Sequence, residues 1–256
     1  MQICYPILFH YFFNFINLRQ SRELSLKKSI LLIVIISLFQ FGFLLSAVKA
    51  QTTLAVLDFE NNSFFNPEEY QPLTKGLADI IITELGQINA VQIVERKDLK
   101  TVLDELKLSQ SGLLSENNSL QVGKMLGAKN LVFGSFMVTM DEKIRVDLRI
   151  VEVETGLTVK ADEVTGKTKQ VLSLIRKLSK KILKDLDIRL TKTEKRNLDK
   201  SQKIRMDAVV YYSKGIDFED AGDLANAILF YKKAVELEPE FQSAKDKLQK
   251  ISNKNQ

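Results

Sequence analysis

Two neighbouring carboxylates offer the clearest prospect of chemistry in this 256-residue chain. Asp58 and Glu60 stand at the end of an apolar segment, TLAVLDF, which is typical of a buried strand. Side chains two residues apart on a strand point to the same side, where a carboxylate pair can bind a metal ion or act as acid and base. No third ligand stands nearby in the sequence. We therefore interpret Asp58 as a turn or helix-capping group, and an enzyme that uses carboxylates alone is the least favoured alternative.

Other residue types that support hydrolytic chemistry are confined to the start of the chain. The single Cys (Cys4) and the single His (His10) both lie within residues 1–50. Zinc sites, thiol nucleophiles and histidine acid–base pairs depend on these side chains. If residues 1–50 are removed, the remaining chain has neither, so we expect no catalytic residues, no metal site and no cofactor.

Residues 1–50 have the pattern of a secretory signal peptide. Lys27 and Lys28 precede the apolar run Ser29–Ala47, and small residues lead to a predicted cleavage site between Ala50 and Gln51. The same run is long enough for a transmembrane helix, so the alternative is an uncleaved segment that anchors the chain in the inner membrane. An apolar, aromatic-rich stretch before it has two open explanations, a start codon assigned too early or an additional membrane segment.

Most of the net charge of +5 comes from this segment. Residues 1–50 hold five of the 37 basic and one of the 32 acidic residues, which leaves 32 basic and 31 acidic residues from Gln51 onward. A protein that binds nucleic acid normally presents a strongly basic face. We therefore expect no nucleic acid among the partners.

Hydrophobic periodicity predicts an α/β (α+β) layered domain over residues 51–190. Buried or alternating segments indicate strands, and apolar residues at intervals of three and four indicate helices, in the order β-α-β-α-α-β-β-β-α. The last three strands, which start near Asn130, Lys143 and Leu157, have connections short enough for hairpins. They are predicted to form an antiparallel meander.

Four segments of this domain carry a family resemblance. They are LAVLDFENNS, GLADIIITEL, VQIVERKDLKTVLDELKLSQSGL and VGKMLGAKNLVFGSF. Together they resemble the CsgG family, the curli-secretion and assembly proteins of bacterial envelopes, over most of residues 52–190. The resemblance implies an exported protein that associates with copies of itself. The TolB amino-terminal domain and LpoB, which activates a penicillin-binding protein, share a similar fold class, so fold alone says less about function.

The sequence departs from CsgG in two respects. CsgG looks like a lipoprotein with a Cys at its cleavage site, whereas Gln51 follows Ala50 here. The CsgG pore is made by long alternating hairpins, and a strand that crosses a membrane needs about 9 to 11 residues. The sheet connections here are the short sequences DEK and ETG. We therefore expect the periplasmic part of a CsgG-type protein without a barrel of its own.

The C-terminal region resembles a single tetratricopeptide (TPR) repeat of about 34 residues, followed by a capping helix, over residues 208–252. The motif positions are Tyr211, Gly215, Phe218, Ala227, Tyr231, Ala234 and Pro239. One repeat buries little surface, so the hairpin should pack on the α/β domain, on the preceding helix or on another chain. Residues 191–207, which are poor in apolar side chains, are predicted to be a linker or an exposed helical connection.

These features favour an envelope assembly or secretion scaffold that is not an enzyme. The CsgG-like domain would make oligomeric contacts between identical copies, and the repeat would dock protein partners of the envelope or secretion machinery. The expected location is the periplasm or the periplasmic face of the outer membrane, with membrane association through the N-terminal segment if it is not cleaved. The alternative is an LpoB-like periplasmic regulator of a peptidoglycan synthase.

Overall fold

The computed structural model describes residues 51–106, 116–199 and 204–254. They belong to one compact unit, residues 51–256. The predicted signal peptide and Ala50 lie outside the described residues, and Gln51 is the first residue within them. Within the described part of the chain, no helix is both long and apolar enough to span a membrane.

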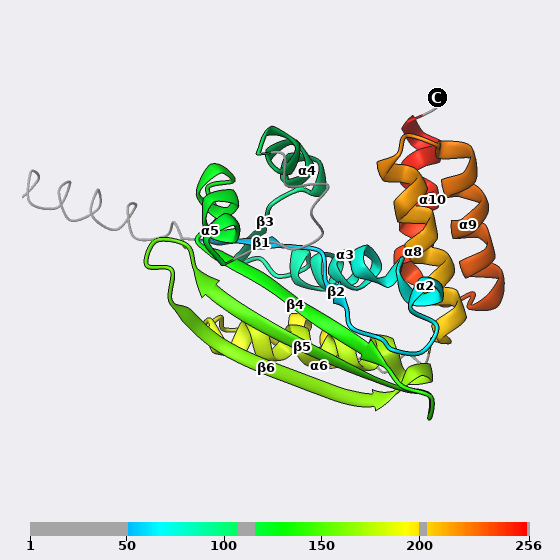
Figure 1. The fold of residues 1–256 in the computed structure, drawn as a ribbon, viewed down its shortest axis with the longest axis horizontal. Coiled ribbons are helices and arrows are strands. Elements are labelled where there is room, and N and C mark those ends of the chain that lie inside the picture. Colours follow the sequence, from blue (N-terminus) through cyan, green and yellow to red (C-terminus); the bar gives the residue numbers. More distant parts are fainter. Residues whose placement is uncertain (1–50, 107–115, 200–203, 255–256) are drawn as a thin grey trace, which may run out of the picture. The chain divides into compact units, whose positions relative to one another are not determined.

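A six-stranded mixed sheet forms the centre of the α/β region (Figure 1). The strands are β1 (Thr52–Val56), β2 (Glu60–Asn61), β3 (Val91–Ile93), β4 (Asn130–Val138), β5 (Lys143–Glu152) and β6 (Thr158–Lys167). Their order is β3-β1-β4-β5-β6, and β2 pairs with β4. Strands β3, β1, β4 and β2 pair in parallel, whereas β4, β5 and β6 form the predicted antiparallel meander. The mixed α/β class is therefore confirmed.

Helices surround this sheet and form the C-terminal region. They are α2 (Pro67–Tyr70), α3 (Leu73–Gly86), α4 (Arg96–Glu105), α5 (Glu116–Met125), the 3₁₀ turn η2 (Thr168–Gln170), α6 (Val171–Asp185), α7 (Lys192–Asp199), α8 (Met206–Asp220), α9 (Leu224–Leu237) and α10 (Gln242–Lys254). Apolar stripes on α3 and α6 pack against one face of the sheet.

Alternation along β5 shows how the sequence separates the two faces of the sheet. Ile144, Val146, Leu148 and Ile150 are buried on the side of α3 and α6. The charged residues between them point to the opposite side, as the two-residue period of a strand requires. Helices α4 and α5 cover part of that side through a smaller apolar cluster that includes Leu57, with the remainder left open.

The structure adds elements that the sequence did not predict. Strand β2 and helix α2 lie between the first predicted strand and the first predicted helix, where the parallel register of Glu60 with Ser135 extends the sheet. The predicted linker contains α7, and this helix is not fully exposed because Glu194 and Leu198 are buried. Thr191 and Glu194 exchange hydrogen bonds in a capping box: Thr191 N–H donates to Glu194 and Glu194 N–H to Thr191 Oγ1.

Helices α8 and α9 form a helical pair with α10 beside it (Figure 1). In the turn between them, Gly222 has a φ of 80°, which glycine adopts without strain, and Asp223 caps α9 by accepting from Asn226 N–H. Helix α10 buries Ala244 and Ile251. The sequence predicted that this pair packs on the α/β domain, on the preceding helix or on another chain. The structure shows packing on the α/β region, because α8 contacts α3 and shares its hydrophobic core.

Candidate functional site

Asp58 and Glu60 do not form a joint site. Asp58 Oδ1 accepts a hydrogen bond from Arg96 Nη1 at 3.0 Å, so the interpretation of Asp58 as a turn or capping group is not what the structure shows. Glu60 lies exposed on β2. In residues 51–106, 116–199 and 204–254, no group of three or more Cys, His, Asp or Glu side chains could hold a metal ion.

Arg96 links the α/β region to the C-terminal helices. It pairs with Asp58, and its Nη2 lies 3.2 Å from Asp220 Oδ2 at the end of α8. Burial lowers the pKa of the Arg96 guanidinium, but Asp58 and Asp220 raise it by more, so its pKa stays above the ordinary value. Lys75 of α3 also reaches α8, at 3.1 Å from Asp217 and 3.0 Å from Asp220.

Behind these pairs lies a buried polar cluster, which we call the buried seam: Asp79, Tyr212, Glu219, Tyr231 and Lys247. The Tyr212 hydroxyl donates to Asp79 Oδ2, and Tyr231 donates to Glu219 Oε2 at 2.6 Å. Lys247 Nζ lies between the two acids, 3.3 Å from Asp79 and 3.1 Å from Glu219. The seam therefore joins α3, α8, α9 and α10 in one hydrogen-bonded network.

Burial sets the electrostatics of the seam. Desolvation, together with the Asp79 charge, raises the pKa of Tyr212 well above its ordinary value, and desolvation with Glu219 does the same for Tyr231. Burial lowers the pKa of Lys247, but the charges of Asp79 and Glu219 raise it by more. The tyrosines are therefore neutral donors and Lys247 a cation at neutral pH.

Two glycines allow the helices around the seam to approach closely. A Cβ at Gly76 of α3 would stand 1.7 Å from Ser213 Oγ of α8, and one at Gly215 would stand 2.5 Å from Tyr231 Cδ1. Both distances are well inside van der Waals contact. Gly215 therefore lies at the close contact of α8 with α9, and Gly76 lies at that of α3 with α8.

The seven predicted repeat positions all lie in the α8–α9 pair or just after it. Ala227, Tyr231 and Ala234 are fully buried, and Pro239 follows the end of α9. Tyr211 and Phe218 are half-buried and both pack against Phe230, with ring centroids 6.1 and 5.3 Å apart. The assignment of this pair to the TPR family remains a prediction.

Sequence reasoning missed Asp79 and Lys247, although one signal for Asp79 was available. It stands inside the apolar stripe of α3, between Leu77 and Ile80, where only buried side chains are expected. A charged residue at such a position needs a partner. That partner, Lys247, is 168 positions away, so no local pattern could identify it.

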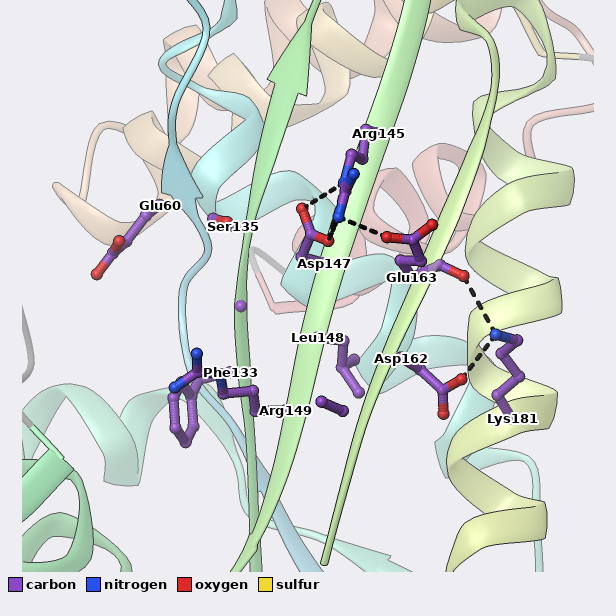
Figure 2. Close-up of a pocket in the computed structure, with 12 residues that line it drawn as sticks. Glu60, Phe133, Ser135, Arg145, Asp147, Leu148, Arg149, Asp162, Glu163 and Lys181 are labelled. Carbon is purple, nitrogen blue, oxygen red and sulfur yellow. Dashed lines mark hydrogen bonds and ion pairs between the residues drawn. The ribbon is translucent and has the colours of Figure 1, made fainter. Parts of the chain in front are cut away.

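The open face of the sheet carries a second charged cluster (Figure 2). Arg145 of β5 makes a bidentate contact with Asp147 and an ion pair with Glu163 of β6 at 2.5 Å. These side chains line an open hollow of about 750 Å³. At its far side, Lys181 of α6 donates to Asp162 at 2.7 Å and to the Glu163 carbonyl oxygen at 3.2 Å. The charges of these side chains are thus paired with one another. The hollow that they line is polar and shallow rather than enclosed.

The fold and the buried seam thus define an α/β sheet protein with a helical module packed on it. The family model described as "Curli production assembly/transport component CsgG" matches residues 39–141. This match supports the CsgG-like assignment of the segment that includes β1 to β4. No curated protein matches the chain.

Several solved structures are similar at low identity. The LpoB C-terminal domain from Salmonella enterica is 18% identical, with a TM-score of 0.35, over 48% of this chain and 87% of that one. TolB from Acinetobacter baumannii is 14% identical, with a TM-score of 0.35, over 53% of this chain and 28% of that one. The PelC dodecamer from Paraburkholderia phytofirmans is 15% identical, with a TM-score of 0.34, over 54% and 90%. Likenesses at this level carry no argument about function.

Proposed function

We propose that this protein is a scaffold for assembly or secretion in the bacterial envelope and that it acts without catalysis or a cofactor. The CsgG family match supports an envelope-associated role. In this proposal the CsgG-like domain, residues 51–190, makes contacts between identical copies. The helices of residues 208–252 dock a protein partner as a TPR repeat with its cap, and residues 191–207 connect the two.

The single observation that carries the proposal is the buried seam. Asp79 on α3 and Lys247 on α10 fix the helical module to the CsgG-like segment through buried hydrogen bonds. A module held in this way presents a surface in a defined orientation to the sheet. Rigid presentation lowers the entropy lost when a partner binds, which suits a scaffold.

The proposed location follows from the sequence of residues 1–50. Cleavage between Ala50 and Gln51 would release the chain into the periplasm or to the periplasmic face of the outer membrane. Without cleavage, the segment would hold the chain in the inner membrane. Mass spectrometry of the protein from the envelope, with Gln51 as the first residue detected, is the expected result.

Light scattering after size-exclusion chromatography tests the scaffold proposal on residues 51–256, which form one compact unit with its own core. We expect a mass of several copies. The same protein, immobilised, should retain envelope proteins that a Leu229→Ser variant, changed at an exposed apolar position of α9, loses. A strict monomer that retains no envelope protein would show the proposal to be wrong, and stimulation of a purified peptidoglycan synthase would favour the regulator instead.

A further inference from the structure

Three large apolar side chains protrude at one end of the sheet. The side chains of Phe64, Met140 and Phe65 are 94%, 78% and 42% exposed. Phe64 and Phe65 follow β2, and Met140 lies in the turn between β4 and β5. Because β2 and β4 run parallel, both segments leave the sheet at the same end (Figure 1). We call these three residues the apolar tip.

The backbone beneath the apolar tip is held by hydrogen bonds on both sides. Asn62 N–H donates to the Phe136 carbonyl at 2.8 Å, and Val138 N–H donates to the buried Ser63 Oγ at 2.9 Å. On the far side, Asn61 Nδ2 donates to the Pro67 carbonyl at 2.8 Å. The loop is thus tied at Ser63 and Pro67, and the two phenylalanines between these points face outward.

The charge next to the apolar tip is acidic. Residues 60–74 contain three glutamates, Glu60, Glu68 and Glu69, and no basic residue. Glu68 and Glu69 are exposed in the first turn of α2, directly after the phenylalanines. An acidic flank disfavours an anionic lipid surface and favours a basic protein surface.

The α8–α9 pair offers a surface of complementary chemistry. Its α3-facing side is occupied by the seam, but Tyr211, Phe218 and Phe230 form a half-buried aromatic group on another side. Lys233 Nζ lies 5.0 Å from the Phe230 ring centre and 5.7 Å from that of Tyr211. Lys214 lies three residues after Tyr211 and four before Phe218, which places it on the same side of α8.

We call these five residues, Tyr211, Lys214, Phe218, Phe230 and Lys233, the aromatic–lysine face. Neither of its lysines makes an ion pair within the described residues. Aromatic rings with flanking cations suit a ligand that is both apolar and acidic. The apolar tip with Glu68 and Glu69 has this chemistry.

We propose that the apolar tip of one copy of this chain docks on the aromatic–lysine face of a second copy. In this contact Phe64 and Phe65 pack on Tyr211, Phe218 and Phe230. Glu68 and Glu69 pair with Lys214 and Lys233. The inference rests on the self-association in the proposed function and places that contact between the CsgG-like domain of one copy and the helical module of the next.

The proposed contact joins two different surfaces, so every copy offers both a tip and a face. Such a contact either closes reciprocally between two copies or continues from copy to copy until a ring closes. In both cases the CsgG-like segment of one copy meets the helical module of the next. The fixed orientation given by the buried seam would then determine the number of copies.

Two charge-reversal variants, one for each surface of the proposed contact, and a third variant that combines them test the proposal. All are made in the full-length chain and purified in mild detergent. Lys214→Glu/Lys233→Glu and Glu68→Lys/Glu69→Lys are each expected to weaken self-association about tenfold or more, measured by sedimentation velocity over a concentration series. The combined four-substitution variant should recover association to within about threefold of the unmodified chain. Phe64→Ser/Phe65→Ser should weaken association without recovery by any charge change.

Matched controls keep the result specific. Lys177→Glu/Lys250→Glu changes the net charge equally at exposed positions on α6 and α10 and should leave the mass unchanged. Circular dichroism should show every variant folded, because all substituted side chains are exposed or half-buried. Association that persists in both charge-reversal variants would overturn the inference and leave the proposed self-association intact.

Two further outcomes separate the remaining explanations. An unmodified chain that is monomeric at every concentration would overturn the self-association of the proposed function, and with it this contact. Vesicles of phosphatidylethanolamine and phosphatidylglycerol test the lipid alternative. If the unmodified chain binds the vesicles, and Phe64→Ser/Phe65→Ser abolishes this binding without changing the oligomeric mass, the apolar tip is a membrane contact. That result would overturn the inference.

Discussion

The buried seam and the open sheet face contain the same kinds of groups in very different surroundings. In the seam, the side chains of Asp79 and Lys247 are 6% and 18% exposed. On the sheet face, Arg145 and Asp147 form a geometrically better bidentate pair, but their side chains are 46% and 42% exposed. The better pairing geometry therefore belongs to the more exposed pair, Arg145 and Asp147. The looser geometry belongs to the less exposed pair, Asp79 and Lys247.

Solvent access decides what each cluster contributes. An exposed ion pair adds little because water and salt screen it, whereas a buried charge that loses its partner carries the full penalty of desolvation. The seam therefore contributes to the attachment of the helical module to the α/β region, together with the hydrophobic core that the two parts share. The cluster on the sheet face leaves the fold unaffected and keeps that surface polar.

Replacement of Asp79 by Ala should have the largest effect of the changes considered. It leaves the buried Tyr212 hydroxyl without its acceptor and the Lys247 ammonium with Glu219 as its only acidic partner among those described. We expect the free energy of unfolding of residues 51–256 to fall by about 3–5 kcal/mol, measured by urea denaturation. Asp79→Asn keeps an acceptor for Tyr212 and should cost less. Equal stability of the Ala variant and the unmodified protein would mean that the seam is not a stabilising element.

The close approach of α3 and α8 gives a second, smaller test. Gly76→Ala places a methyl group where Ser213 Oγ stands 1.7 Å away, so one helix must move. We expect a loss of about 1–3 kcal/mol in unfolding free energy. Ser213→Gly removes the opposing side chain, and the double variant should recover part of this loss. Strictly additive effects in that cycle would contradict direct contact between the two positions.

The sequence predicted the elements of this molecule better than the contacts between them. Alternation along residues 143–152 predicted β5 and its two faces, because strand periodicity is a local property. The aromatic, glycine and alanine pattern of the last helices likewise indicated a helical region, because helix periodicity is also local. The contact of Asp79 with Lys247 depends on how distant segments pack, and no spacing rule describes that.

The short elements show a second limit of prediction. Strand β2 has two residues and acquires strand geometry by pairing with β4, which no run of apolar residues announces. The region of helix α7 was predicted to be a linker or an exposed helical connection because it has few apolar residues, although the sequence T-K-T-E contains the capping-box signature. Attention to capping at Thr191 and Glu194 would have predicted that helix.

Alkaline titration should reveal the seam without changing its packing. The pKa values of Tyr212 and Lys247 are both raised in the folded protein, so both groups hold their protons more tightly than in the unfolded chain. The stability that they contribute is complete below their unfolded pKa values of about 10 and is lost as pH rises beyond them. Unfolding free energy measured between pH about 8 and about 11 should therefore fall.

Tyr212→Phe provides the control for this titration. It removes one of the three seam groups whose pKa is raised, which are Tyr212, Tyr231 and Lys247. It keeps the aromatic ring that packs on Tyr231 and Phe241. The variant should be less stable at pH about 8, because Asp79 loses a hydrogen bond, and should show a shallower alkaline decline. An alkaline slope identical to that of the unmodified protein would assign the decline to other groups.

Arg145→Ala should have the smallest effect and completes the comparison. It removes the bidentate contact with Asp147 and the ion pair with Glu163 at once, so a stability role for the sheet-face cluster would be evident. Because water replaces the lost partner of each exposed acid, the urea midpoint should match that of the unmodified protein within error. A midpoint shift as large as that of Asp79→Ala would show that pairing geometry outweighs burial in this fold, and the distinction between the two clusters would fail.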